Sequence, residues 1–148
     1  MSRPTSAQLV LNQKKNSHGT KPKKNIVKIN VYATGKTRAR KSKLRRLIKK
    51  VLAAEEKSFT TVSVILTDDA YLKRLSEQYF NKKRSTNVIS FDLGKEVEIY
   101  VSENKARDAY DLYYFVLHGL LHAIGYDHRK KKDDLLMQKK CSDYIDYA

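Results

Sequence analysis

The chain has 148 residues, which is enough for one domain with a single hydrophobic core. No apolar run reaches the roughly 18 residues that a membrane-spanning helix needs, and the first two dozen residues contain no apolar stretch of signal-peptide length. Its single cysteine, Cys141, excludes an internal disulfide. We therefore expect a cytoplasmic protein with no membrane partner, in which Cys141 packs within a C-terminal helix rather than acting as a reactive thiol.

The net charge of +15 is distributed unevenly along the chain. Residues 1–57 contain 17 Lys and Arg but two acids, whereas residues 58–148 contain 14 residues of each sign. Such an excess at one end indicates a polyanionic partner, and nucleic acid is the commonest one. Solubility or contact with an acidic lipid surface would explain the same charge.

The N-terminal part of the chain predicts a tail, a strand and a basic helix. Residues 1–25 are polar and basic with little to bury, so we expect a tail. Apolar residues alternate over residues 25–32, which predicts a strand. The following helix has an apolar stripe, and Lys43, Arg46 and Lys50 lie among the basic residues on the remainder. Because ordinary solvated faces mix charge signs, a phosphate-contacting face fits this pattern as well as a solvated one.

The rest of the chain predicts a strand, a helix, a basic loop, a strand pair and two helices. The strand covers residues 60–67, and the helix after it begins at Asp68 or Asp69. The basic loop covers 81–85, and the strand pair covers 86–93 and 96–102. The two last helices cover 111–124 and 129–147. Helical crossovers join parallel strands and tight turns join antiparallel ones. We therefore predict an α/β (α+β) fold in which helices pack on a mixed four-stranded sheet.

Three of the four histidines lie in HGLLHAIGYDH, residues 118–128. His118 and His122 are one helical turn apart, so both imidazoles can reach one metal ion. His128 is six residues farther along, an offset of about 240° around a helix, so the helix must end before it. Gly125 lies where that end is needed, because glycine adopts the left-handed conformation of helix ends at little cost.

Three imidazoles leave one position of a tetrahedral ion open to water, which is typical of catalytic rather than structural zinc. We predict one zinc ion per chain on His118, His122 and His128, since three imidazoles suit zinc best. The alternative is that the first two are hydrogen-bonded core histidines and the third is a surface residue. Asp127 would orient an imidazole, hydrogen-bond the turn or handle protons.

The same spacing occurs in the metzincin proteases, whose signature is H-E-x-x-H-x-x-G-x-x-H. The one difference is Gly119, which stands where those proteases have their general-base glutamate. A peptide substrate would also leave the positive charge unexplained. Metal-assisted hydrolysis of a different bond is therefore the better interpretation.

The whole stretch resembles the motif of the YbeY endoribonucleases, the rRNA maturation factors, which is close to H-G-x-L-H-x-x-G-Y-D-H. Every fixed position of that motif is met here. The segments LSEQYF, TNVISFD and VEIYVS resemble further parts of the family, so the resemblance covers roughly residues 26–148.

The resemblance implies that residues 26–148 form a single metal-dependent endoribonuclease domain with a zincin-like metal-site helix. It implies zinc on the three histidines and single-strand-specific cleavage of RNA. It also implies a role in maturing the 3′ end of small-subunit rRNA and in ribosome quality control. The small ribosomal subunit and its assembly factors would then be partners, and an rRNA precursor would be the substrate.

Two positions depart from the family pattern. Phe80 stands where the family often has an arginine that is important for RNA, and Ser76 replaces an asparagine. Arg84, in the following loop, is a candidate to supply a guanidinium instead. A second hypothesis therefore accompanies the endoribonuclease, namely an RNA-binding ribosome-assembly factor whose metal is structural. The residues suggest no general base.

Overall fold

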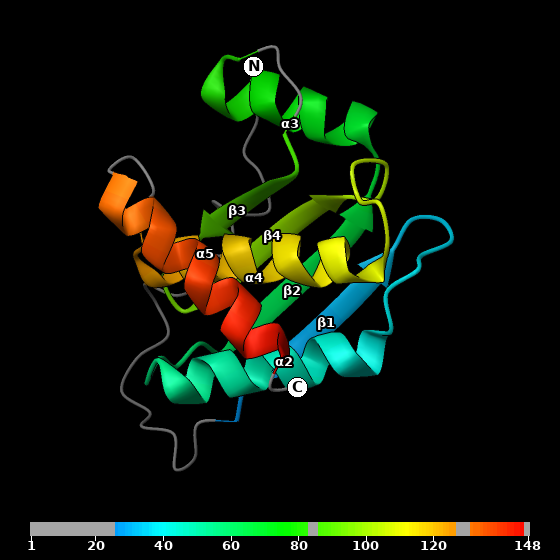
Figure 1. Cartoon of the computed structure of the whole chain (residues 1–148). Coiled ribbons are helices and arrows are strands. Elements are labelled where there is room, and N and C mark those ends of the chain that lie inside the picture. Colours follow the sequence, from blue (N-terminus) through cyan, green and yellow to red (C-terminus); the bar gives the residue numbers. More distant parts are fainter. Residues whose placement is uncertain (1–25, 83–85, 127–130, 147–148) are drawn as a thin grey trace.

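The computed structural model describes residues 26–82, 86–126 and 131–146, and its elements follow one another in the predicted order (Figure 1). The strands are β1 (Lys28–Ala33), β2 (Thr61–Thr67), β3 (Val88–Asp92) and β4 (Glu96–Ser102). The helices are α2 (Lys41–Ala54), α3 (Asp69–Phe80), α4 (Ala109–Ile124) and α5 (Lys131–Asp146). The predicted tail, residues 1–25, lies outside the described residues.

The four strands form one mixed sheet in the order β1-β2-β4-β3. β1 pairs with β2 and β2 with β4 in parallel, because helical crossovers separate these strands along the chain. β3 pairs with β4 antiparallel, since only a short turn at Gly94 joins them. The predicted α/β domain with a mixed four-stranded sheet is thereby confirmed, and β3 lies at an edge of the sheet.

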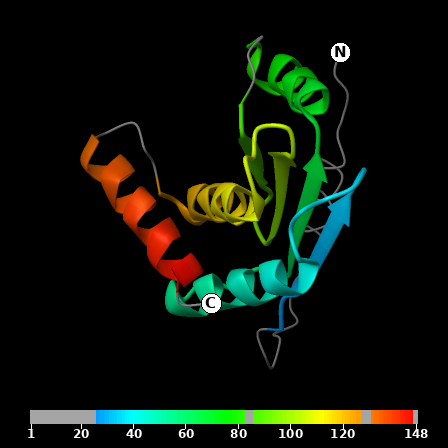
Figure 2. The ribbon, with the colours of Figure 1, turned by 45° about the vertical axis from the view of Figure 1, so that its right-hand side comes forward.

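Helices contact both faces of the sheet. Successive side chains of a strand point to opposite faces. Accordingly Ile99 of β4 lies against Gly119 of α4, whereas Tyr100 stacks on Tyr71 of α3, with ring centroids 6.0 Å apart. On the α4 side, α5 packs across α4 and α2 closes the layer near β1 (Figure 2). α4 is thus enclosed by other elements, and nine of its residues are buried.

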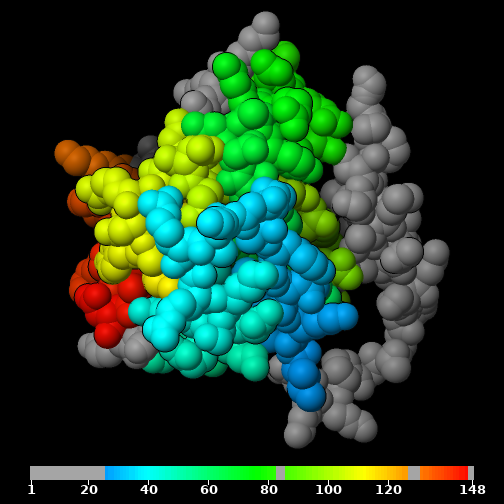
Figure 3. Space-filling model, turned by 90° about the vertical axis from the view of Figure 1, so that its right-hand side faces the viewer, coloured from blue at the N-terminus to red at the C-terminus, as the bar shows by residue number. Residues whose placement is uncertain are grey.

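α2 is amphipathic as predicted. Its buried residues are Leu44, Leu47, Ile48, Val51 and Leu52. The basic side chains alternate with these along the helix, and Arg46 and Lys50 are exposed. β1 and α2, drawn in blue to cyan, form much of one face of the molecule (Figure 3). The described part of the basic N-terminal region therefore presents most of its charge on α2, which packs beside β1.

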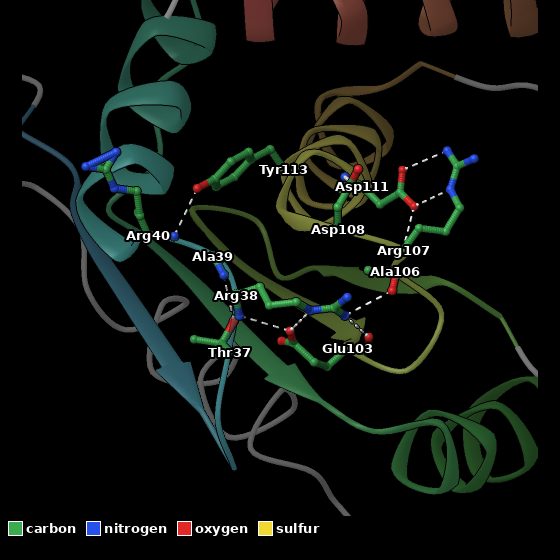
Figure 4. A network of polar contacts seen from close by, with 10 residues as sticks. All are labelled: Thr37, Arg38, Ala39, Arg40, Glu103, Ala106, Arg107, Asp108, Asp111 and Tyr113. Carbon is green, nitrogen blue, oxygen red and sulfur yellow. Dashed lines mark hydrogen bonds and ion pairs between the residues drawn. The ribbon is translucent and has the colours of Figure 1, made fainter.

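One basic residue of this region has a structural role instead. The Arg38 guanidinium donates hydrogen bonds to the backbone carbonyls of Glu103 (2.8 Å) and Ala106 (2.9 Å), and its Nε donates to the Glu103 carboxylate at 3.2 Å (Figure 4). Two residues on, the backbone N–H of Arg40 donates to the Tyr113 hydroxyl of α4 at 3.0 Å. These bonds hold the start of α2 against the start of α4.

α4 begins two residues earlier than predicted. The Asp108 side chain accepts a hydrogen bond from the backbone N–H of Asp111 at 3.1 Å, which caps the helix. Arg107 in turn hydrogen-bonds Asp111, and this contact lowers the pKa of the Asp111 carboxyl below its ordinary value (Figure 4). The first turn of α4 is therefore fixed by charged side chains, a local signal that the apolar periodicity does not contain.

Cys141 lies in α5 and is fully buried, as expected. Burial raises the pKa of its thiol to about 12, so the thiolate is scarcely populated near neutral pH. In the described parts of the chain no helix has both the length and the apolar character to cross a bilayer.

Candidate active site

His118 and His122 lie side by side on α4. Their ring centroids are 4.8 Å apart with an angle of 75° between the ring planes, and both are partly buried. Two imidazoles that bind one tetrahedral ion through Zn–N bonds of about 2.0–2.1 Å have centroids about 5 Å apart. The i,i+4 spacing has therefore brought the two rings to a separation that fits a shared ion.

α4 ends where the motif predicts. Gly125 is the C-cap residue with φ +127°, and its N–H donates to the carbonyls of Leu121 and His122. The N–H of Tyr126 also donates to the Leu121 carbonyl, at 3.0 Å, so the chain turns off the helix axis directly after the glycine. His128 and Asp127, the other predicted site residues, lie outside the described residues.

Residues 26–82, 86–126 and 131–146 contain no group of three His, Cys, Asp or Glu side chains placed to hold a metal ion. They supply two imidazoles, so a third ligand has to come from elsewhere. His122 also lies in the last turn of α4, where the helix dipole favours a positive charge. The donor type, the separation of the rings and the helix end all fit a zinc ion at this position.

Both imidazoles open into a pocket of about 830 Å³. One wall is α4 with Phe115, Gly119 and the histidines, and the opposite wall is the edge strand β3 with the segment that leads into it. The end of α3 supplies Phe80, with Lys82 just beyond it, and α5 supplies Asp134 and Gln138. The pocket therefore follows the open edge of the sheet, with the candidate metal ligands on its α4 wall.

Gly119 allows α4 to approach the sheet closely. A Cβ atom at this position would lie 2.9 Å from both Val88 Cγ2 and Ile99 Cγ2, which is closer than such atoms can pack. These methyl groups belong to β-branched residues with stiff side chains, so they cannot swing away at little cost. A glutamate at this position could not fit unless α4 or these side chains shifted. The packing at this position therefore disfavours a protease-type base.

A partly buried carboxylate holds the chain that leaves α4. Glu55, the C-cap residue of α2, accepts hydrogen bonds from the Tyr126 hydroxyl at 2.7 Å, from Lys140 at 3.0 Å and from the Tyr144 hydroxyl. Burial raises the pKa of Glu55, but these hydrogen bonds outweigh it and hold the pKa below its ordinary value. Burial and the contact with Glu55 raise the pKa of Tyr144 to about 12. Glu55 thereby joins α2, α5 and the turn after α4.

This role of Glu55 was not predicted from the sequence. Glu55 and Glu56 are the two acids among residues 1–57, against 17 basic residues, and an acid in such a basic region is itself a sign of a specific partner. Tyr126, its partner, lies within the histidine motif. Through this hydrogen bond, the tyrosine of the motif fixes the backbone close in sequence to His128, the predicted third ligand.

The candidate RNA-binding residues do not gather at the pocket. Lys43 lies over the Tyr113 ring, with its Nζ 5.0 Å from the ring centroid, and Arg46 and Lys50 project from the outer face of α2. None of these three is among the described residues that line the pocket. Arg84 lies outside the described residues. Among the described residues, the pocket is lined by a cation that was not predicted from the sequence, Lys82.

The sequence profile described as endoribonuclease YbeY matches residues 30–147. The chain belongs to this family. The predicted resemblance to this family is thereby confirmed. It extends over most of the chain and is not limited to the eleven-residue histidine motif.

Individual YbeY relatives agree with this assignment. The endoribonuclease YbeY of Flavobacterium psychrophilum is 36% identical over 106 residues, which cover 63% of this chain and 76% of that protein. The endoribonuclease YbeY of Aquifex aeolicus is 28% identical over 142 residues, which cover 85% and 93%. The solution structure of TM1509 from Thermotoga maritima superimposes with a TM-score of 0.52 at 30% identity and covers 79% of this chain and 86% of that one.

The close contact at Gly119 makes a prediction for stability. Gly119→Ala should lower the free energy of unfolding, because overpacking costs about 1–3 kcal/mol while alanine returns about 1 kcal/mol of helix propensity. Gly35→Ala is the matched control, since open space surrounds Gly35 and its backbone needs no glycine. Urea unfolding of both variants measures the difference. A Gly119→Ala protein more stable than the unsubstituted chain would contradict the close approach.

The Glu55 cluster makes a prediction for pH dependence. Its folded-state pKa is lowered, so its contribution to stability is complete above the ordinary value of 4.5 and is lost as the pH falls through the folded-state pKa. Glu55→Gln should therefore cost about 1–3 kcal/mol at neutral pH, and the cost should shrink on acidification. Urea unfolding from pH 7 to 3 measures it, with the exposed neighbour as control in Glu56→Gln. An equal loss at every pH would refute the role of the charge.

Proposed function

We propose that this chain is a metal-dependent, single-strand-specific endoribonuclease that acts on rRNA precursors. Membership of the endoribonuclease YbeY family supports the reaction class. The observation that carries the proposal is the pair of imidazoles on α4, 4.8 Å apart, at the wall of an open pocket beside a sheet edge. His118, His122 and His128 would hold one zinc ion, and Asp127 would support the last of these.

The residues of the chain account for binding and orientation of the substrate. When bound, a zinc ion supplies a Lewis acid that polarises a phosphoryl oxygen and lowers the pKa of water. Lys82 places a positive charge at the pocket for a phosphate of the RNA backbone. Asn87, Ser90 and Gln138 line the same space with neutral hydrogen-bonding groups, which suit ribose hydroxyls and base edges.

The form of the pocket supports single-stranded rather than duplex RNA as the proposed substrate. It lies between the edge strand and α4, and side chains from α3 and α5 reach into it. Single strands offer unstacked bases that can enter such a recess, whereas a duplex presents a broad outer surface. From the resemblance to the family we further propose a role in the 3′ end maturation of small-subunit rRNA and in ribosome quality control in the cytoplasm, with the small ribosomal subunit and its assembly factors as partners.

The basic face of α2 favours a second candidate function, RNA binding in ribosome assembly with a structural metal. Arg46 and Lys50 are exposed on α2, yet neither is among the described residues of the pocket. A surface of this kind would hold RNA at a distance from the imidazoles. Binding without cleavage is the result that would favour this candidate over the nuclease.

The nuclease proposal predicts loss of both metal and activity on removal of an imidazole. His122→Ala should lose bound zinc, measured by elemental analysis of the purified protein, and should cut single-stranded RNA at least about 100-fold more slowly, because the ion and its charge stabilisation are lost. Tyr110→Ala is the control, since it truncates an exposed ring on the same helix outside the lining of the pocket. Mapping the cut ends of an rRNA precursor identifies the site. Undiminished cutting by His122→Ala would refute the metal-centred mechanism.

The α2 face makes a separate prediction for RNA affinity. Arg46→Ala should weaken binding of single-stranded RNA uniformly across sequences and should reduce the slope of log affinity against log salt by about 0.7, the value for one phosphate contact on a single strand. Lys95→Ala, an exposed lysine in the β3–β4 turn, is the control and should leave the slope unchanged. Fluorescence anisotropy titrations over a range of salt concentrations measure both. Equal slopes for the unsubstituted chain, Arg46→Ala and Lys95→Ala would show that RNA does not contact α2 at Arg46.

A further inference from the structure

An exposed phenylalanine lies at the rim of the pocket. Phe80 is the last residue of α3, its surface is 48% exposed, and it lines the same pocket as the two imidazoles. The helix ends here because Asn81 adopts the left-handed conformation (φ 55°, ψ 38°). The chain then doubles back, and the N–H of Lys82 donates to the Ser76 carbonyl at 3.3 Å. This turn brings a ring and an ammonium group to one end of the pocket.

The Phe80 ring is supported from within the fold. It lies almost parallel to the Phe91 ring of β3, with centroids 6.2 Å apart and planes 11° apart. Phe91 also makes edge contacts with Tyr79 (5.2 Å) and Tyr100 (5.8 Å), and Tyr100 stacks on Tyr71. These four supporting rings join α3 to the sheet. Phe80 is the most exposed of the five rings in this cluster, and Phe91 supports it from within the fold.

The chemistry around this ring suits a nucleobase. Single-stranded nucleic acids are held by aromatic rings on which bases stack, combined with cations that follow the backbone. Lys82 supplies a cation at the same pocket, and Arg74 lies over the Tyr71 ring on α3, with its guanidinium carbon 5.5 Å from the centroid. The end of α3 and the turn after it therefore bring both components, Phe80 and Lys82, to the pocket, whereas Arg74 is not among the described residues that line it.

We propose that Phe80 is a stacking platform for a base of the single-stranded RNA substrate, with Lys82 beside it for an adjacent phosphate. This inference rests on the proposed function and adds how one base of the RNA substrate is bound. The base would lie on the exposed face of Phe80, and the strand would continue into the pocket toward His118 and His122. Since every base has a π face, this contact would be tolerant of sequence but would require a base.

The test compares substitutions in both the protein and the RNA. The probes are a short fluorescent single-stranded RNA and the same RNA with one nucleotide at a time made abasic. Phe80→Ala in the zinc-loaded full chain should raise KM and weaken binding about 5- to 150-fold, the range for losing one base–aromatic stack, while kcat changes little. Phe80→Trp should retain affinity. At one abasic position, Phe80→Ala should cause no further loss, because the stacking partner is already missing.

Two controls separate stacking from a structural effect. Tyr32→Ala removes another exposed aromatic ring, 54% exposed on β1 and absent from the lining of the pocket, and should leave affinity unchanged. An RNA that carries 2-aminopurine reports stacking through quenching of its fluorescence, and this quenching should disappear in Phe80→Ala. Thermal unfolding of each variant verifies that the fold is retained.

The outcomes separate the two proposals. A protein that neither binds nor cuts single-stranded RNA would overturn the proposed function, and this inference with it. A protein that cuts RNA equally well with Phe80→Ala would overturn the inference alone. So would losses of affinity that are the same for Phe80→Ala and Phe80→Trp, or that persist in full at every abasic position.

Discussion

The architecture depends on the contact between α4 and the sheet at Gly119. Because this residue has no side chain, the helix backbone lies against the methyl groups of Val88 and Ile99, which belong to the two strands of the hairpin. That contact sets the depth of α4 in the fold. It also sets the depth of His118 and His122, which lie one residue before and three residues after it. The width of the pocket between α4 and β3 is thus a consequence of one absent side chain.

Other contacts complete the positioning of the imidazoles. At its start, α4 is held by its Asp108 cap and by the bond from Arg40 to Tyr113. At its end, Gly125 turns the chain and Glu55 holds the Tyr126 hydroxyl. The helix that carries the imidazoles is thereby fixed at both ends and along its length. The proposed zinc site would need such rigidity, because metal ligands are held by rigid elements with supporting contacts.

Much of the fold could be predicted from the sequence because it follows from local patterns. The apolar stripe of α2, the alternation in β4 and the short turn at Gly94 each determine an element within a few residues. The end of α4 at Gly125 was predictable for the same reason. These features need no knowledge of what lies across the molecule.

Features that depend on distant residues were not predictable in this way. The placement of β4 between β2 and β3 arises from crossover connections and burial of the whole sheet. The contact of Glu55 with Tyr126 joins residues 71 positions apart, and that of Arg38 with Glu103 joins residues 65 apart. The position of Phe80 at the pocket required the fold as well. The histidine motif predicted the two imidazoles, but it contains no information on β3 and the end of α3, which form the opposite side of the pocket.

The two walls of the pocket also differ in how firmly they are built. Nine residues of α4 are buried, whereas α3 buries Leu72 and Ser76 and is otherwise joined to the sheet by rings that remain partly exposed. Elements with few buried apolar contacts open at a lower free energy than the core does. Native-state fluctuations should therefore release α3 and its side of the pocket long before they disturb α4. In the proposed function, His118 and His122 would then lie on a rigid helix, while the α3 side of the pocket would adjust to RNA strands of different sequence.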